Sequence, residues 1–178
     1  KGTTMARQLS QDAAEEACDL EPENAAYLLR KAQVASALSN YDDATLGVRS
    51  VLDNESTPPI VKAQALHEMA QLAALGDAEI AGKTISFENK AIALADTLAT
   101  SKNTKERRAA KQLLVEAHLS VARQIAGQSY DNQLESVSQW VGRASGLAED
   151  LIAHDGGSVE LRLMVAKESL SRKRSRES

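Results

Sequence analysis

Apolar residues recur at intervals of three and four positions along most of this chain, which is the period of an amphipathic α-helix. The pattern is clearest over residues 13–59, where two short polar breaks separate three helical segments. The apolar positions that share a face on the second and third of these segments are Leu28, Ala32, Ala35, Ala44, Val48, Val51 and Leu52. The spacing therefore predicts two helices that face one another across a turn.

Prolines and polar residues mark where these helices end. Pro22 has no backbone N–H to donate, so the first helix has to stop before it. Residues 39–42 form a polar turn, and Pro58 with Pro59 closes the third helix and opens a fourth. The helices expected from these signals span residues 5–20, 23–38, 42–54, 59–75, 85–100, 106–126, 132–153 and 158–170.

Two further breaks interrupt the later part of the chain. Residues 78–84 insert an extra turn before the fifth expected helix, and residues 101–105 form a polar linker before the sixth. The last helix follows Gly156 and Gly157, which are typical helix-terminating residues. A closing helix of this kind is expected to cover the exposed end of a helical array.

The composition favours an all-α domain. Hydrophobic residues make up 43% of the 178 positions, but aromatic residues make up only 3%, and alanine supplies much of the apolar total. Alanine is the strongest helix former, and small side chains let helix axes approach to the short end of about 8–10 Å. We therefore expect one all-α domain of stacked helical hairpins over residues 1–170, followed by a basic, disordered tail over residues 171–178.

Residues 13–59 resemble the tetratricopeptide repeat (TPR), a helix-turn-helix unit of about 34 residues with the signature W-x2-L-G-x2-Y, then A-x3-F, then a closing proline. Pro22 aligns with the closing proline of one repeat, and the clearest repeat then covers residues 22–57. The residues at its remaining signature positions are Leu28, Ala32, Ala35, Ala44, Val48 and Val51. Lys31 and Ser56 depart from the signature, at its leucine and at its next proline.

The resemblance implies an α-α superhelix of about three to four irregular TPR-like hairpins with a C-terminal capping helix. Domains of this kind are non-catalytic scaffolds that bind a partner peptide or protein segment on their concave face. By analogy, the residues expected on that face are Arg30, Gln33, Gln64, His67, Gln71, Lys111, Leu114 and His118. Neither histidine has a second histidine or a cysteine at metal-ligand spacing, so both are expected to be partly exposed groove residues.

One function found in the family is disfavoured by the residues themselves. Co-chaperones of the family hold a C-terminal carboxylate with lysine, asparagine and arginine side chains, and only Lys111 fits that set here. Glu68 stands at another of these positions and would repel a carboxylate. The chain therefore looks unlike a receptor for chaperone tails.

Charge and motifs disfavour several other classes of protein. A formal net charge of −4 argues against general nucleic-acid binding, and no apolar run approaches the roughly 18 residues needed to cross a bilayer. Gly82, Lys83 and Thr84 lack the glycine five positions earlier that a phosphate-binding loop needs. Cys18 is the lone cysteine, which rules out an internal disulfide and fits a reducing compartment such as the cytoplasm. We therefore expect no enzyme activity, metal or cofactor.

Two other functions stay open. The domain could be a structural spacer or an oligomerisation arm, in which Trp140, Val141 and Leu147 form a contact between two copies. It could also be a regulatory module of a larger protein whose catalytic domain lies outside this chain, since the chain opens on Lys1 rather than methionine. A measurement of self-association distinguishes the first of these from partner binding.

Overall fold

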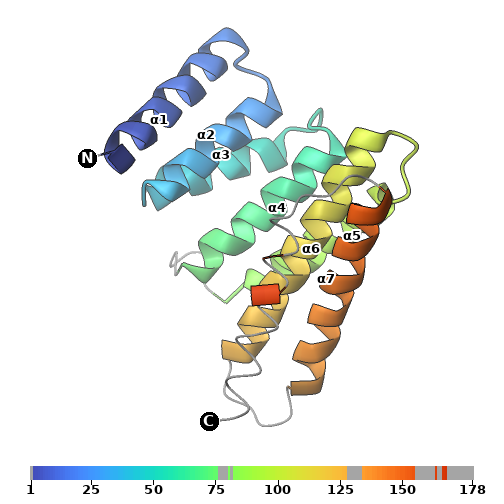
Figure 1. Ribbon diagram of the computed structural model, residues 1–178. Helices are drawn as coiled ribbons and strands as arrows, with labels where there is room; N and C mark the ends of the chain where they lie inside the picture. The colour runs from blue at the N-terminus through green and yellow to red at the C-terminus, as the bar shows by residue number, and fades with distance from the viewer. Residues whose placement is uncertain are drawn as a thin grey trace. The chain divides into compact units, whose positions relative to one another are not determined.

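The computed structural model describes residues 2–75, 80, 82–127, 134–154, 163, 166 and 167. Within these residues the chain forms seven α-helices and no β-strand, which confirms the predicted all-α class (Figure 1). The helices are α1 (Gly2–Leu20), α2 (Ala25–Ala37), α3 (Tyr41–Asp53), α4 (Pro59–Ala74), α5 (Thr84–Leu98), α6 (Thr104–Gly127) and α7 (Leu134–His154).

The ends of these helices agree with the sequence-based bounds to within three residues. The polar linker expected over residues 101–105 has the predicted length of five residues but covers residues 99–103, because α5 ends at Leu98 and α6 begins at Thr104. The closing helix expected over residues 158–170 lies outside the described residues, apart from the helical positions 163, 166 and 167. The basic tail at residues 171–178 lies outside them as well.

The chain divides into two compact units, residues 1–87 and residues 88–178. The first unit holds α1 to α4 and the first turn of α5, and the second holds the rest of α5 with α6 and α7. The expectation of one domain over residues 1–170 stays a prediction.

In the first unit α1 packs on α2, α2 on α3 and α3 on α4, and α2 also packs on α4. The buried residues of the shared core come from α2, α3 and α4, with one further residue before α5: Ala25, Leu29, Ala32, Ala44, Val48, Val51, Val61, Ala65, Met69, Leu72, Ala73 and Ile80. Leu28 and Ala35, which the helical pattern placed at the centre of this face, are only partly buried at its edge. Because α2 contacts α1, α3 and α4, it is the central helix of this unit.

Local hydrogen bonds define both ends of α2. At its start, Oδ1 of Asn24 accepts a hydrogen bond from the backbone N–H of Ala26 at 3.0 Å, so the side chain caps the helix. At its end, the N–H of Asn40 donates to the carbonyl of Ala35 at 2.9 Å, and the N–H of Ser39 donates to Ser36 at 2.9 Å. This pair of bonds is the Schellman arrangement, which needs a left-handed residue, and Ser39 takes that conformation with φ of 65°.

In the second unit α6 and α7 pack along one another. Their buried core consists of Val115, Leu119, Ala122, Val141, Ala144, Ala148 and Leu151. From Leu113 to Ala122 every residue of α6 except Glu116 is buried. A helix buried over ten consecutive positions with one exception is covered on more than one side, so α6 is a central helix rather than a surface one.

Candidate functional site

Five of the eight candidate partner-binding residues lie on α2 and α4 of the first unit. Arg30 is exposed, whereas Gln33, Gln64, His67 and Gln71 are half-buried. The three on α4 are spaced by three and four positions, so they share one side of that helix. We call the surface formed by these five residues the α2–α4 face.

Glu68 links the two helices of the α2–α4 face. Its carboxyl lies on α4 and makes hydrogen bonds with Ser36 and Gln33 of α2. Burial raises the pKa of Glu68 above its ordinary value of 4.5, and the opposing effects of Ser36, His67 and Gln33 lower it only in part. The carboxyl therefore joins α2 to α4, which places Gln33 beside the α4 residues of the face.

The chemistry of the α2–α4 face is that of binding through hydrogen bonds. A glutamine amide carries both a donor and an acceptor, and Arg30 adds a cation with several donors. Nη1 of Arg30 lies 3.5 Å from Oε1 of Gln33, so the two side chains meet at the surface of α2. His67 and Gln71 already interact with other residues of the chain. Such groups match the alternating N–H and C=O groups of an extended peptide.

The other three candidates lie on α6, and the structure corrects the prediction that they line an open groove. Leu114 is 1% exposed and His118 is 5% exposed, so neither side chain is accessible to a partner. Lys111 is partly buried, and its Nζ donates to Oδ2 of Asp150 on α7 at 2.6 Å. The prediction failed because it assumed that α6 has an open face at these positions.

His118 is a buried histidine in contact with an aromatic ring. Its ring meets that of Trp140 edge to face, with the centroids 5.1 Å apart. Burial lowers the pKa of His118, Arg143 lowers it further, and Asp96 opposes both. Nδ1 is buried and completes no hydrogen bond, although the carbonyl of Leu114 lies near enough to raise the pKa slightly. This environment favours the neutral imidazole.

Asp150 connects α7 to α6 and to the end of its own helix. Besides Lys111, its carboxyl contacts Nδ1 of His154 at 3.0 Å through Oδ1. The hydrogen bond from Lys111 is the main reason why the pKa of Asp150 lies below its ordinary value of 3.8. Lys111 thus fastens α6 to α7, which explains why it is not a groove cation.

Trp140, Val141 and Leu147 were the side chains proposed to join two copies of the chain. Val141 is buried, and Trp140 and Leu147 pack against the core between α6 and α7. The guanidinium of Arg143 lies 5.2 Å from the centre of the Trp140 ring. Val141 therefore packs within one chain, whereas Trp140 and Leu147 are only partly buried and their assignment to a contact between copies stays a prediction.

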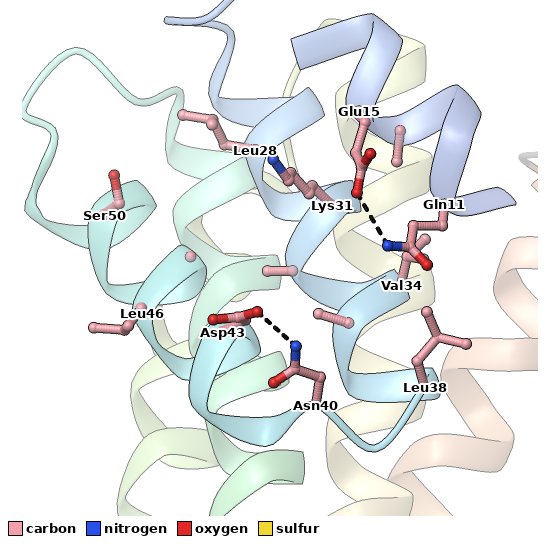
Figure 2. A pocket seen from close by; sticks show the side chains of 14 residues that line it. Gln11, Glu15, Leu28, Lys31, Val34, Leu38, Asn40, Asp43, Leu46 and Ser50 are labelled. Carbon is pink, nitrogen blue, oxygen red and sulfur yellow. Dashed lines mark hydrogen bonds between the residues drawn. The ribbon is translucent and has the colours of Figure 1, made fainter. Parts of the chain in front are cut away.

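A hollow of about 450 Å³ opens in the first unit between residues of α1, α2 and α3 (Figure 2). We call it the α1–α3 groove, because these two helices supply its walls and α2 supplies its floor. Its lining residues on α1 are Gln11, Ala14 and Glu15. Those on α2, including its C-cap Leu38, are Leu28, Lys31, Ala32, Val34, Ala35 and Leu38. Those on α3, including its N-cap Asn40, are Asn40, Asp43, Leu46, Gly47 and Ser50. No motif marked this groove in the sequence, since its lining combines single residues from three successive helices rather than one contiguous segment.

Metal sites and membrane-spanning helices are both absent from the described residues. In this part of the chain no three His, Cys, Asp or Glu side chains converge as a metal site would require. Nor does any of the described helices combine the length and apolar character that crossing a bilayer needs.

Comparison of the chain with protein-family models, with curated proteins and with solved structures gives no match. The function has to be argued from the geometry of the chain itself.

Proposed function

We propose that this chain is a TPR-like protein-interaction module whose helices form a superhelical stack, with the α2–α4 face on its concave side. This face binds an extended segment of a partner protein. The module acts by binding rather than by catalysis and needs no cofactor. Packed helices hold the binding side chains in place before the partner arrives, which reduces the entropy lost on binding.

The contact between α2 and α4 is the observation that carries this proposal. In a stack of helical hairpins, the first helices of successive hairpins lie side by side and line one face. With α2 and α3 as one hairpin and α4 as the start of the next, the packing of α2 on α4 supports such a stack. The hydrogen bonds of Glu68 to Ser36 and Gln33 reinforce the same contact.

The composition of the α2–α4 face favours an extended segment over a helical one. Gln33, Gln64 and Gln71 each offer a donor and an acceptor, and an extended segment leaves its backbone groups available for pairing. A helix satisfies these backbone groups internally. Arg30 is the exposed cation of the face and suits a partner with a nearby acidic side chain.

The two alternative functions remain proposals of lower rank. The contact proposed for an oligomerisation arm has less support, because Val141 is buried and Trp140 and Leu147 pack partly against the core between α6 and α7. A regulatory module of a larger protein would still use a binding face of this type, so it differs in context rather than in mechanism. Sedimentation of the purified chain tests the first alternative directly.

Selection from a library of displayed linear peptides tests the proposed function. Peptides selected on the wild-type chain are measured by calorimetry against Arg30→Ala/Gln64→Ala and against the control Lys31→Ala/Lys62→Ala, which changes one neighbouring residue on each of the same helices. We expect the first variant to bind about tenfold more weakly, as for residues at the centre of an interface, and the control to bind like wild type.

Unchanged binding by Arg30→Ala/Gln64→Ala would contradict the proposed function, as would the failure to select any peptide. Loss of binding in the control alone would move the site toward Lys31, which lines the α1–α3 groove. Circular dichroism of both variants shows whether a loss of affinity reflects a loss of fold.

A further inference from the structure

The α1–α3 groove is an open trough with an apolar floor. Leu28, Ala32, Ala35 and Leu38 are among its floor residues, and Ala14 from α1 and Leu46 from α3 flank them. Leu46 is 62% exposed, so its apolar side chain is accessible at the edge of the groove. Ala35 is a small, partly exposed residue of this floor, and such a residue lets another helix approach closely.

The walls of the groove leave room for an additional helix. In the described contacts, α1 packs on α2 and α3 packs on α2, but α1 and α3 do not pack on each other. The lining positions on α3 are Asp43, Leu46, Gly47 and Ser50, with the spacing of three and four that places them on one side of that helix. A helix lying between α1 and α3 would therefore meet a continuous strip of α3 and the floor supplied by α2.

The charge of the groove specifies what kind of helix fits it. Glu15 on α1 and Asp43 on α3 come from opposite walls, while Lys31 is the single lining cation (Figure 2). Both carboxylates are exposed and are held by neighbours on their own segments, Glu15 by Gln11 at 3.0 Å and Asp43 by Asn40. A helix with cations along both edges of its apolar face can pair with the two walls at once.

The first unit as a whole carries a net negative charge, like the lining of the groove. Residues 1–87 contain 13 acidic and 7 basic side chains, a formal charge of −6, whereas residues 88–178 contain 12 acidic and 14 basic ones, a charge of +2. The field of the first unit therefore attracts cationic segments toward the groove and repels anionic ones.

We propose that the α1–α3 groove is a second docking site, independent of the α2–α4 face, for a basic amphipathic helix of a partner protein. The helix places small and medium apolar side chains on the floor formed by α2. Its lysines or arginines pair with Glu15 on one wall and Asp43 on the other. The mode is that of an amphipathic helix in an apolar groove, with the charges setting orientation.

The probe for this site is a synthetic amphipathic helical peptide with leucine and alanine on one face and lysine on the other. Two comparison peptides have glutamate in place of lysine, or the same composition in scrambled order. Affinity is measured by fluorescence anisotropy for the wild-type chain, for Glu15→Lys/Asp43→Lys and for Glu16→Lys/Asp42→Lys. The last is a matched control, since Glu16 and Asp42 are exposed neighbours that do not line the groove, and Asp42 shares the first turn of α3 with Asp43.

We expect the lysine peptide to bind the wild-type chain and the control variant with similar affinity, and Glu15→Lys/Asp43→Lys about tenfold more weakly, as for the reversal of two rim charges. Equal losses in both charge variants would overturn the proposal, because general attraction to an acidic surface would then explain the binding. Scrambled or glutamate peptides that bind as tightly as the lysine peptide would overturn it too, as would the absence of saturable binding.

One further variant separates this proposal from the proposed function. Arg30→Ala/Gln64→Ala changes the α2–α4 face but no residue that lines the groove. It should bind the lysine peptide like wild type. If it loses the peptide instead, the peptide occupies the α2–α4 face and the docking site in the groove is refuted, while partner binding by the chain stands.

Discussion

Gly47 of α3 faces Ala32 of α2 so closely that a Cβ added at Gly47 would lie 3.0 Å from the Cβ of Ala32. Both residues belong to the interface between α2 and α3, and Ala32 is 2% exposed. The separation of the two helices at this point is therefore set by the absence of a side chain on Gly47. A larger residue on either side has to move a helix.

Gly47→Ala should destabilise the chain, although alanine is the better helix former. The added methyl group overpacks the α2–α3 interface, and we expect a loss of about 1 kcal/mol in the free energy of unfolding. Ala32→Leu should cost about 1–3 kcal/mol for the same reason. Gly142→Ala is the control, because a Cβ there meets nothing within 4 Å, and it should stabilise α7 by about 0.5–1 kcal/mol. Urea denaturation measures the free energy of unfolding of all three variants. A change of the same sign for Gly47→Ala and Gly142→Ala would contradict the packing argument.

Ser39→Gly should stabilise the turn between α2 and α3. Ser39 has φ of 65°, a left-handed conformation that costs a residue with a Cβ about 1–2 kcal/mol and costs glycine little. Part of this gain is offset by the greater freedom of glycine in the unfolded chain, so we expect a net stabilisation of about 0.5–1 kcal/mol. Ser50→Gly, in the interior of α3, should destabilise instead. A lower thermal midpoint for Ser39→Gly than for wild type would argue against the assigned turn.

His118→Phe should remove part of the pH dependence of stability. Because burial lowers the pKa of His118, the unfolded chain takes up a proton at this residue at a pH where the folded chain does not. The contribution of His118 to the free energy of unfolding is therefore complete above pH 6.5. It is lost as the pH falls from 6.5 through the lowered pKa, by up to about 1.4 kcal/mol for each pH unit by which the pKa is lowered.

The measurement is the urea midpoint of wild type and of His118→Phe at about pH 7.5 and about pH 5.5. Phenylalanine retains a ring against Trp140 but cannot bind a proton. The variant should lose less stability on acidification than wild type, and identical losses would show that His118 does not titrate with unfolding.

Glu68→Gln should act in the opposite direction. The raised pKa of Glu68 means that the folded chain holds a proton at this residue which the unfolded chain releases above 4.5. The contribution of the protonated Glu68 to the free energy of unfolding is thus complete below pH 4.5 and is lost as the pH rises through the raised pKa. Glutamine avoids the burial of a charge and retains an acceptor for Ser36, so the variant should be more stable than wild type at neutral pH. Glu16→Gln, at an exposed position, should change the midpoint little.

Much of the fold could be predicted because its signals are local. Pro22 stops a helix by backbone chemistry alone, and α1 ends two residues before it, while Pro59 opens α4; α3 ends at Asp53, before the proline pair is reached. The start of α2 was placed at Glu23 rather than after Asn24, although asparagine is a strong N-cap residue and its side chain makes the capping bond here. That signal was present in the sequence.

The candidate site was harder to predict because burial depends on neighbours that are distant in sequence. Leu113, Leu114 and Val115 are consecutive apolar residues, a pattern that does not define one polar side of a helix, and all three are buried. That apolar run indicates a helix that is buried on several sides, and it argues against placing Leu114 and His118 on an open face. The ion pair between Lys111 and Asp150 joins residues 39 positions apart, so no local sequence pattern indicates it.

In the part of the first unit that the structure describes, α1 packs on α2 and on no other helix, so it can open in a way that the other helices cannot. It can detach and return while the packing of α2, α3 and α4 stays intact, so its amide protons should exchange with solvent through a local opening of low free energy. Detachment also removes one wall of the α1–α3 groove, so a bound helix would hold α1 in place and slow that exchange. Amide protection in α1 would therefore rise with the concentration of the bound helix, and α1 would report occupancy of the groove.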